Sequence, residues 1–189
     1  MLNRSIPGQM TDSELRRVIA LAQAVPENGV IVEVGSLYGL CSWHLAKSCA
    51  PGVTVFCIDP WERQPWIVEQ VEGPNKAPPF GRAAFEQYTA DCDNIVVVQG
   101  YSPRVARGWH LPIDLYVEDA VHTNPVLSAN IKFWGGMVRP GGVISGHDYT
   151  SIWPDVIQEA NTLARVWDSA LSVTDTLWSI PKPKPIIAA

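Results

Sequence analysis

The sequence has few charged residues for its length and no long apolar run. Only 17% of the 189 residues are charged, and 14 basic against 19 acidic residues leave a net charge of −5. Binding of nucleic acid by electrostatics alone needs a basic surface, so this composition disfavours it. No stretch approaches the roughly 18 consecutive apolar residues of a membrane span, and the first ten residues lack the apolar segment of a secretion signal. We expect one cytoplasmic domain over residues 1–189 that contacts no membrane.

Closely spaced cysteine pairs are also absent. No two of the four cysteines form a C-x-x-C pair, which disfavours a zinc site, and without a secretion signal a disulfide framework has no oxidising compartment. We expect buried thiols at Cys41, Cys49, Cys57 and Cys92. Tryptophan, in contrast, is abundant with eight residues, and four of them stand next to proline or turn signals where they could wall a ligand pocket: Trp61, Trp66, Trp109 and Trp153.

The chain alternates between helical and strand patterns. Thr11 and Glu14 form a T-x-x-E capping box, which predicts a helix with apolar positions from Leu15 to Val25. The other helices are expected over 40–48, 80–91, 104–107, from the Asn124-Pro125 pair to Trp134, and from Pro154 to Ala164; the strands over 30–34, 53–58, 95–98, 113–117, 143–145, 170–173 and 176–180. This alternation predicts an α/β fold in which helices cover both faces of a parallel sheet.

Two segments do not fit the alternation. Residues 60–80 hold five prolines together with Trp61 and Trp66, a pattern that is too broken for one regular element and predicts a mobile flap. The end of the chain, 182–189, is expected to form a loose tail whose lysines keep the chain in solution. The many aromatic residues are compatible with a homodimer, which a light-scattering mass would test.

The polar residues of interest directly follow strands: Glu33, Asp59, Ser102, Asp119, and the pair His147-Asp148. Ligands bind at the carboxyl ends of the strands in an open parallel sheet, so these residues predict a site at that edge. Gly35 and Gly39 lie in a strand-to-helix turn where a ligand can approach the backbone and the helix amino end. The dinucleotide pattern G-x-G-x-x-G fails there, because Leu37 and Leu40 take its second and third glycine positions. Alternatively, the two glycines serve only a tight turn.

Asp59 ends the next predicted strand, 24 positions after Gly35. A carboxylate at this place can accept hydrogen bonds from both hydroxyls of a ribose. Its alternative role is to cap the turn before Pro60. Together with the glycine turn, Asp59 favours a ligand that contains adenosine.

The sequence resembles the class I S-adenosylmethionine-dependent methyltransferases, and within them the metal-dependent O-methyltransferase branch that includes the macrocin type. Three matching segments come early in the chain: the E-x-G-x-x-x-G turn at Glu33 to Gly39, the ribose-binding acid at Asp59 and the adenine-side segment at Gly100 to Ser102. Three come later: the D-x-x-H strand end at Asp119 to His122, the P-G-G-x-I-x-x-H-D segment at Pro140 to Asp148 and the final antiparallel strand at Thr176 to Trp178. The resemblance implies a Rossmann-like, doubly wound, seven-stranded sheet, mostly parallel, with the last strand antiparallel.

The resemblance also implies S-adenosylmethionine (SAM) as cofactor and a divalent ion such as Mg²⁺. It assigns cofactor binding to Glu33, Gly35, Ser36, Gly39, Asp59, Ser102 and Asp119. It assigns metal binding to Asp119, Asp148 and His147, and carboxylates at strand ends suit a hard cation. Relatives often carry a carboxylate in place of His147, so this histidine either selects a softer ion or binds none.

We expect His122 to be the general base, with Asp119 as the second catalytic residue. The unperturbed pKa of histidine near 6.5 suits removal of a hydroxyl proton at neutral pH. Taken without the surrounding pattern, a helix-capping Asp119 and a turn His122 would be the simpler interpretation.

The leading hypothesis is therefore O-methylation of a hydroxyl on a small molecule, such as a sugar or natural product. Four residues depart from the family pattern and keep open a protein that binds the cofactor or a nucleotide without transferring methyl groups: Ala120, Val121, Asn124 and Asn130. An NAD-dependent oxidoreductase is a weaker alternative, because the sequence lacks both the dinucleotide pattern and a Tyr-x-x-x-Lys pair.

Overall fold

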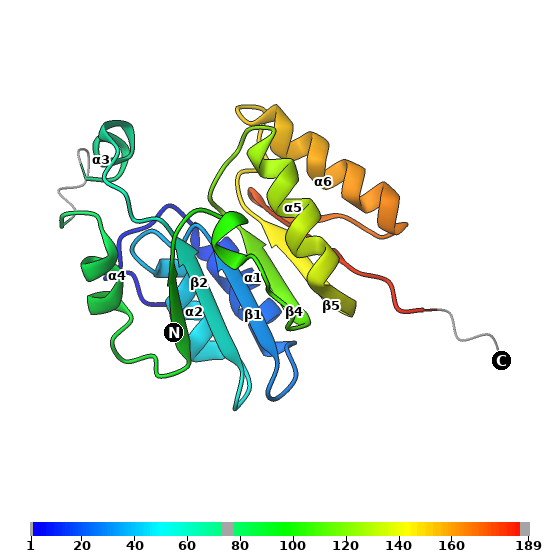
Figure 1. Ribbon diagram of the computed structural model, residues 1–189, viewed down its shortest axis with the longest axis horizontal. Helices are drawn as coiled ribbons and strands as arrows, with labels where there is room; N and C mark the ends of the chain where they lie inside the picture. Colours follow the sequence, from blue (N-terminus) through cyan, green and yellow to red (C-terminus); the bar gives the residue numbers. More distant parts are fainter. Residues whose placement is uncertain (1, 73–77, 186–189) are drawn as a thin grey trace.

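A computed structural model describes residues 2–72 and 78–185. Its elements follow in the order α1 (Asp12–Gln23), β1 (Val30–Val34), α2 (Leu40–Ser48), β2 (Thr54–Asp59), α3 (Pro65–Glu72), α4 (Arg82–Tyr88), β3 (Ile95–Gln99), the short 3₁₀ helix η1 (Arg104–Ala106), β4 (Ile113–Glu118), α5 (Val126–Met137), β5 (Val138–Gly146), α6 (Pro154–Trp167), β6 (Ser172–Thr174) and β7 (Leu177–Pro181). Figure 1 shows the strands side by side in one sheet with helices around them.

The seven strands form one mixed sheet in the order β3-β2-β1-β4-β5-β7-β6. The pairs from β3 to β5 are parallel, whereas β7 runs antiparallel to both β5 and β6. The predicted fold class is thereby confirmed. The chain order reverses between β1 and β4, and in such sheets the ligand crevice lies at the carboxyl ends of the two strands on either side of this point.

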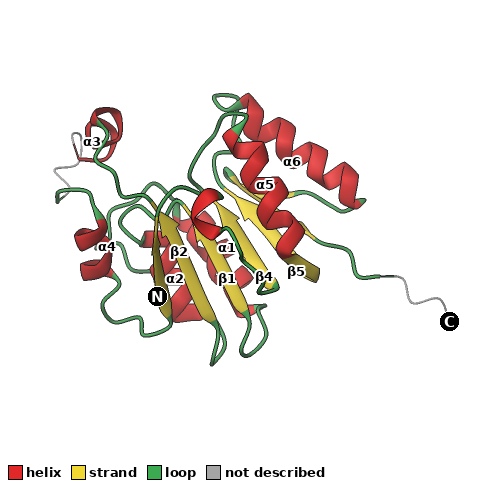
Figure 2. Cartoon of the chain, viewed as in Figure 1, coloured by secondary structure: helices red, strands yellow, loops and turns green. Residues whose placement is uncertain are grey.

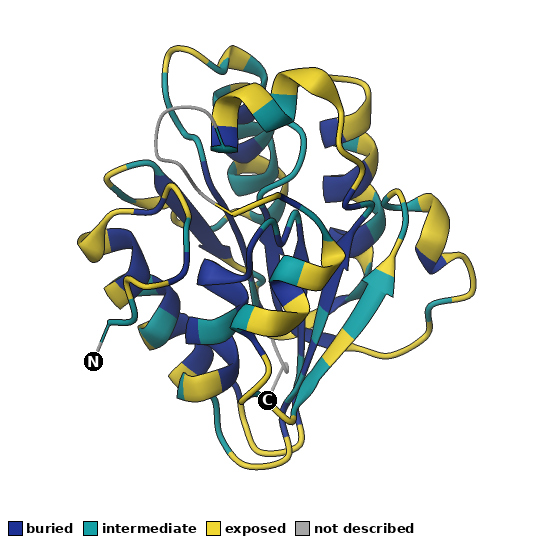
Figure 3. Ribbon diagram, turned by 90° about the vertical axis from the view of Figure 1, so that its left-hand side faces the viewer, coloured by how far each residue is buried: buried dark blue, intermediate teal, exposed yellow. Residues whose placement is uncertain are grey.

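Helices cover both faces of the sheet (Figure 2). Side chains alternate along a strand, so neighbouring residues of β1 belong to different layers. Ile31 packs in the layer with α1 and α2, and Val32 packs in the layer with α5 and α6. Figure 3 shows buried residues along the central strands and exposed residues on the outer helices and loops. Such a two-sided core explains why these strands read as continuous apolar runs.

The sequence-based interpretation of 60–80 was wrong in one respect. Residues 65–72 form the regular helix α3, and Figure 1 shows it standing away from the sheet. Pro65 is the first residue of this helix, where its missing N–H costs no hydrogen bond, and no proline follows before its end. Residues 73–77 of the predicted mobile flap lie outside the described part.

Two further boundaries differ from the sequence-based expectation. The strand predicted from Val143 begins at Val138, which pairs with Ile113 of β4. Gly141 N–H donates to Lys182 O and Lys182 N–H to Gly142 O, so the segment before Val143 is also paired on its other side. The Lys182 side chain donates to the carbonyls of Gly135 and Val138, so the tail is attached at this residue. Residues 186–189 lie outside the described part.

The helix expected to begin at Pro125 begins one residue later. Pro125 is the N-cap, and Asn124 Oδ1 accepts a hydrogen bond from Ser128 N–H at 3.0 Å. The capping role of Asn124 is therefore retained by its side chain. The predicted thiols are free; Cys41 and Cys57 are buried, whereas Cys49 and Cys92 are only partly so. In the described residues no helix is both long and apolar enough to cross a membrane.

Candidate active site

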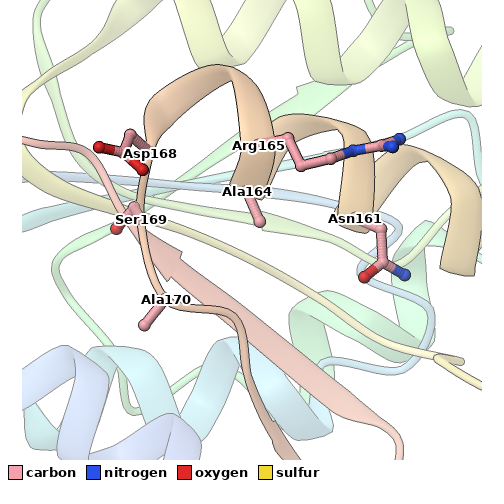
Figure 4. Close-up of a pocket in the computed structure, with 6 residues that line it drawn as sticks. All are labelled: Asn161, Ala164, Arg165, Asp168, Ser169 and Ala170. Atoms are coloured by element: carbon pink, nitrogen blue, oxygen red, sulfur yellow. The ribbon is translucent and has the colours of Figure 1, made fainter.

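A cavity of about 540 Å³ opens at the carboxyl ends of the central strands. This volume lies in the range of small-molecule sites. Its walls come from the turn after β1, the ends of β2 and β4, the start of α5, helix α3 and the segment 7–10. A second hollow, at the end of α6, is open and is lined by the residues shown in Figure 4, none of which follows a central strand: Asn161, Ala164, Arg165, Asp168, Ser169 and Ala170.

The turn after β1 passes within contact distance of the end of β4. Gly35 has φ +91°, and a Cβ atom built on it would lie 2.2 Å from the Asp119 carbonyl oxygen. No side chain fits in that space, so glycine is required here. Gly39 has φ +93° and caps α2, but it faces Thr89 and does not line the cavity. The structure therefore gives Gly39 a turn-forming role instead of the expected cofactor contact.

Glu33 lies beneath this turn and also does not line the cavity, contrary to the expectation. Its Oε2 atom accepts hydrogen bonds from Ser36 Oγ at 2.6 Å and from Ser42 Oγ, and the residue is fully buried. Burial raises the pKa of the carboxyl, and the two serine hydroxyls oppose that rise. Glu33 thus fixes the turn from below, whereas Ser36 lines the cavity.

Asp59 ends β2 and lines the cavity, as expected. Its Oδ2 atom accepts backbone N–H groups of Ser36 and Leu37 at 3.0 and 3.1 Å, and its Oδ1 atom accepts Trp61 N–H at 2.6 Å. Burial raises the pKa of this carboxyl against the effect of those bonds. Asp59 therefore ties the turn after β1 to the start of the 60–80 segment, a role that its position before Pro60 had left open.

Ser102 lines the cavity beside a buried polar chain. Its Oγ donates to Asn130 Oδ1 at 2.9 Å and accepts from Trp134 Nε1 at 2.8 Å. Asn130 Nδ2 in turn lies 3.3 Å from Glu118 Oε1, and burial raises the pKa of Glu118 to about 7. Asn130, one of the residues that depart from the family pattern in the sequence, is thus a structural bridge between β4 and the loop after β3.

Asp119, His122 and Asp148 meet at the edge of the cavity. One ligand atom from each lies within 4.8 Å of the others, the only such group of three in the described part of the chain. His122 Nε2 lies 2.8 Å from Asp148 Oδ2. Asp148 adopts φ +62°, a left-handed conformation that Asp tolerates better than most residues. The His122 ring stacks on Trp153 with centroids 4.7 Å apart.

Charges in this group shift the pKa values in opposite directions. Burial acts against protonation of His122, but Asp148, Asp119 and Glu118 outweigh it and raise the His122 pKa. For Asp148, burial is outweighed by the two histidines, which hold its pKa well below the usual range. The pKa of Asp119 is raised, mainly by burial. The site therefore holds one acidic carboxylate, one basic imidazole and one carboxylate that protonates more easily.

A comparison with protein families identifies the family of this chain. The methyltransferase domain family matches residues 32–149, which is more than half of the chain and includes every residue of the cluster. The chain belongs to this methyltransferase family. The family and the fold imply SAM as the methyl donor, and the glycine turn with the cavity beside it is the place that can hold it.

Solved structures share the fold at low sequence identity. The chain superposes on a Corynebacterium glutamicum protein with TM-score 0.70 and 12% identity, covering 96% of this chain and 86% of the other. The O-methyltransferase TomG from Streptomyces achromogenes, in complex with SAM, gives 0.68 and 15%, covering 94% and 82%. An rRNA methylase from Streptococcus thermophilus gives 0.64 and 13%, covering 94% and 100%. The fold alone therefore does not separate small-molecule from RNA acceptors.

His147 of the methyltransferase was expected as a metal ligand, and the structure surrounds it with carboxylates instead. Its Nδ1 lies 3.4 Å from Asp119 Oδ1 and 3.2 Å from Asp148 Oδ2, and its Nε2 lies 3.2 Å from Glu14 Oε2. Burial lowers its pKa, but these three carboxylates prevail and raise it to about 12. A protonated imidazole offers no lone pair to a metal, so the geometry favours His147 as the counter-ion of the acidic pair.

From the sequence, Glu14 was expected only to cap a helix. The structure confirms the capping box, with Thr11 N–H donating to Glu14 Oε2 at 2.8 Å, and adds contacts to Thr176 and His147. Glu14 is 1% exposed, and these bonds outweigh its burial and lower its pKa to about 2. The buried carboxylate of Glu14 thus joins α1 to the β6–β7 hairpin and to His147 at the carboxyl end of β5.

Substitution of Glu14 should cost more stability than loss of the helix cap. Glu14→Gln leaves His147 with one buried counter-charge fewer, and removing one partner of a buried ion pair costs about 3 kcal/mol of unfolding free energy or more. Thr11→Ala removes the cap bond and an exposed hydrogen bond from Thr11 Oγ1 to Asp175 Oδ2, and costs about 1 kcal/mol. Urea denaturation at pH 7 measures both, and equal losses for the two variants would contradict the role of the ion pair.

Stability should also fall at alkaline pH through His147. Its pKa rises from 6.5 in the unfolded chain to about 12 in the fold, so its contribution is complete below pH 6.5 and is lost as pH rises toward 12. The expected slope is at most about 1.4 kcal/mol per pH unit. Urea denaturation at pH 7.0 and 8.5 should show the difference between wild type and His147→Gln shrinking by about 2 kcal/mol. A stability difference between the two proteins that stays constant with pH would contradict a protonated His147 in the folded protein.

Two of the four tryptophans that were expected to wall a pocket line the cavity, and one further segment of its lining was not identified from the sequence. Trp66 and Trp153 carried the weak signal of aromatic residues beside turns, and both line the cavity, whereas Trp109 packs against Phe56 and Trp134. The segment 7–10 also lines the cavity and carries no chemical signature in the sequence.

Proposed function

We propose that this methyltransferase transfers the methyl group of SAM to a hydroxyl of a small molecule with the help of a divalent cation, as the resemblance to the macrocin-type O-methyltransferases implies. The convergence of Asp119, His122 and Asp148 within 4.8 Å at the cavity supports this most directly. These residues come from the ends of β4 and β5 and the loop that follows β4, so the fold brings together groups that are up to 29 positions apart.

The chemistry of the donor atoms fits a hard divalent ion. Carboxylate oxygens suit Mg²⁺ or Mn²⁺, which prefer oxygen ligands and keep coordinated waters. Asp119 and Asp148 would hold the ion. His122 Nε2 lies 2.8 Å from Asp148 Oδ2, so the imidazole stands beside the two carboxylates and is left to act as the base. When bound, the ion would supply Lewis-acid polarisation of the acceptor hydroxyl.

The residues of this chain would perform the remaining work. SAM supplies a methyl group on a positively charged sulfur. His122, in its neutral form, would accept the proton of the acceptor hydroxyl, and stacking on Trp153 holds its ring in one orientation. Gly35 and Ser36 offer backbone close to the cavity that would hold the cofactor, and the close approach of Gly35 to Asp119 would bring cofactor and acceptor side by side.

A protein that binds SAM without catalysis is the second candidate. Asn130 favours it, because this residue stands where relatives carry an acid and its amide is occupied by Glu118 and Ser102. The NAD-dependent oxidoreductase, the weaker alternative from the sequence, has less support, because Leu37 and Leu40 occupy the positions where a dinucleotide turn needs glycine.

Calorimetric titration of S-adenosylhomocysteine (SAH), with NAD as the parallel control, tests this function. We expect saturable SAH binding and no NAD binding, and a separate Mg²⁺ titration that saturates in wild type and is lost in Asp119→Asn/Asp148→Asn. Binding of NAD alone would contradict the proposal. Binding of SAH without methyl transfer to any hydroxyl compound would support the non-catalytic alternative.

A further inference from the structure

The cavity wall away from the glycine turn is apolar and aromatic. Trp66 and Ile67 from α3, Val126 at the start of α5 and Trp153 before α6 all line it. Trp66 is 64% exposed and Val126 is 42% exposed. Large apolar side chains that remain exposed around one opening are typical of a binding surface. This part of the wall is therefore suited to an apolar face of the acceptor.

The described lining of the cavity holds no side chain of permanent positive charge. Among the described residues that line the cavity there is no lysine or arginine, while four carry carboxylates: Asp59, Glu62, Asp119 and Asp148. Asp119 and Asp148 face His147 and would also face the proposed cation, so their charges are balanced. Asp59 accepts three backbone N–H groups. These three carboxylates do not by themselves decide the charge of an acceptor.

Glu62 differs from the other three. Its Oε2 atom accepts hydrogen bonds from the Tyr101 hydroxyl at 2.5 Å and from Gln64 Nε2 at 3.1 Å, and both donors are neutral. Within the described residues Glu62 has no ion pair, whereas the neighbouring Arg63 pairs with Glu72. The cavity therefore contains one uncompensated negative charge and aromatic faces, which attract a cation.

We propose that the acceptor of this methyltransferase carries no negative charge: it is an uncharged or ammonium-bearing hydroxyl compound with a flat apolar face that lies against Trp66. This inference rests on the proposed function and specifies its substrate class. A carboxylate or phosphate on the acceptor would lose its hydration against apolar walls and find no guanidinium or ammonium partner in the described lining. RNA, whose backbone is a row of phosphates, is disfavoured for the same reason.

Three phenols that differ mainly in the charge of one substituent test the inference. Tyramine is a cation, 4-ethylphenol is neutral and 4-hydroxyphenylacetate is an anion at pH 7.5. Binding of each is measured by calorimetry or ligand-observed NMR on the protein saturated with SAH and Mg²⁺. We expect tyramine and 4-ethylphenol to bind at least tenfold more tightly than 4-hydroxyphenylacetate. Equal or tighter binding of the anion, or of a short RNA hairpin, would overturn the inference.

Variants of the wall provide a second measurement. Val126→Lys places a cation in the lining and should raise the affinity for 4-hydroxyphenylacetate at least tenfold, whereas Val126→Gln, of similar polarity but uncharged, should not. Trp66→Ala should weaken 4-ethylphenol binding about tenfold, and Trp66→Phe should retain most of it. Both sites are exposed, so folding is not at risk. An unchanged anion affinity in Val126→Lys would overturn the inference.

The outcomes separate this inference from the function on which it rests. SAH is titrated first, and methyl transfer to 4-ethylphenol is followed by isotope release from labelled SAM. If SAH does not bind, the proposed function fails and the inference fails with it. If SAH binds and the anion binds as well as the neutral phenol, only the charge preference fails.

Discussion

His122→Ala should lower kcat of methyl transfer by about 100- to 10,000-fold, the usual contribution of a positioned general base. The affinity for SAH should stay within about threefold of wild type, because the contacts that hold the glycine turn do not involve His122 and only acceptor activation depends on it. Steady-state kinetics with a hydroxyl acceptor and calorimetry with SAH measure the two quantities separately.

The pH profile and metal binding give the controls for His122. Because the neighbouring carboxylates raise its pKa and a base must be neutral, activity should rise with pH through a value above 6.5. Mg²⁺ affinity should change little in His122→Ala and fall at least tenfold in Asp148→Asn. A tenfold loss of Mg²⁺ affinity in His122→Ala would instead make His122 a metal ligand. Unchanged turnover in both variants would remove the mechanism.

Gly35→Ala should abolish cofactor binding and destabilise the fold. The new Cβ would lie 2.2 Å from the Asp119 carbonyl oxygen at φ +91°. The left-handed conformation costs roughly 1–2 kcal/mol for a residue with a side chain, and the forced shift of β1 against β4 adds about 1–3 kcal/mol. We expect an SAH affinity at least 100-fold weaker and a Tm lower by roughly 5–15 °C.

Gly136→Ala is the matched control. Gly136 lies inside α5, and a Cβ there would meet nothing within 4 Å. The same chemical change should therefore raise stability by about 0.5–1 kcal/mol, because alanine favours the helix more than glycine does. Differential scanning calorimetry compares the two variants. A Tm for Gly35→Ala equal to that of wild type would show that the contact with Asp119 is not restrictive.

The sequence predicted the elements of the fold well where one local pattern decides them. The capping box of Thr11 and Glu14 gave the start of α1, and the apolar runs after Gly29 and Pro51-Gly52 gave β1 and β2 to within one residue. The sequence pattern did not predict helix α3 at 65–72 or the start of β5 at Val138. Helix α3 begins at a proline and holds no further proline, and the early start of β5 depends on pairing of Val138 with Ile113 of β4 and of Gly141 with Lys182, both distant in the chain.

Some of the predicted site residues line the cavity and others do not. Gly35, Ser36, Asp59, Ser102, Asp119, His122 and Asp148 all line the cavity and follow strand ends that the sequence predicted. Glu33 and Gly39 do not line it. Their spacing is that of the family turn, but whether a turn residue faces the ligand or the core depends on backbone dihedral angles that the sequence does not display.

The sequence by itself determined the order of helices and strands, the carboxylates at the strand ends and the excess of acidic over basic residues, because these depend on local propensity and composition. Only the tertiary structure decided that Glu14 and His147 form a buried ion pair, that Asp59 is occupied by backbone N–H groups and that Trp66 and Trp153 line the cavity. Each of these depends on contacts between residues distant in the chain, whose formation is decided by how the helices pack on the sheet.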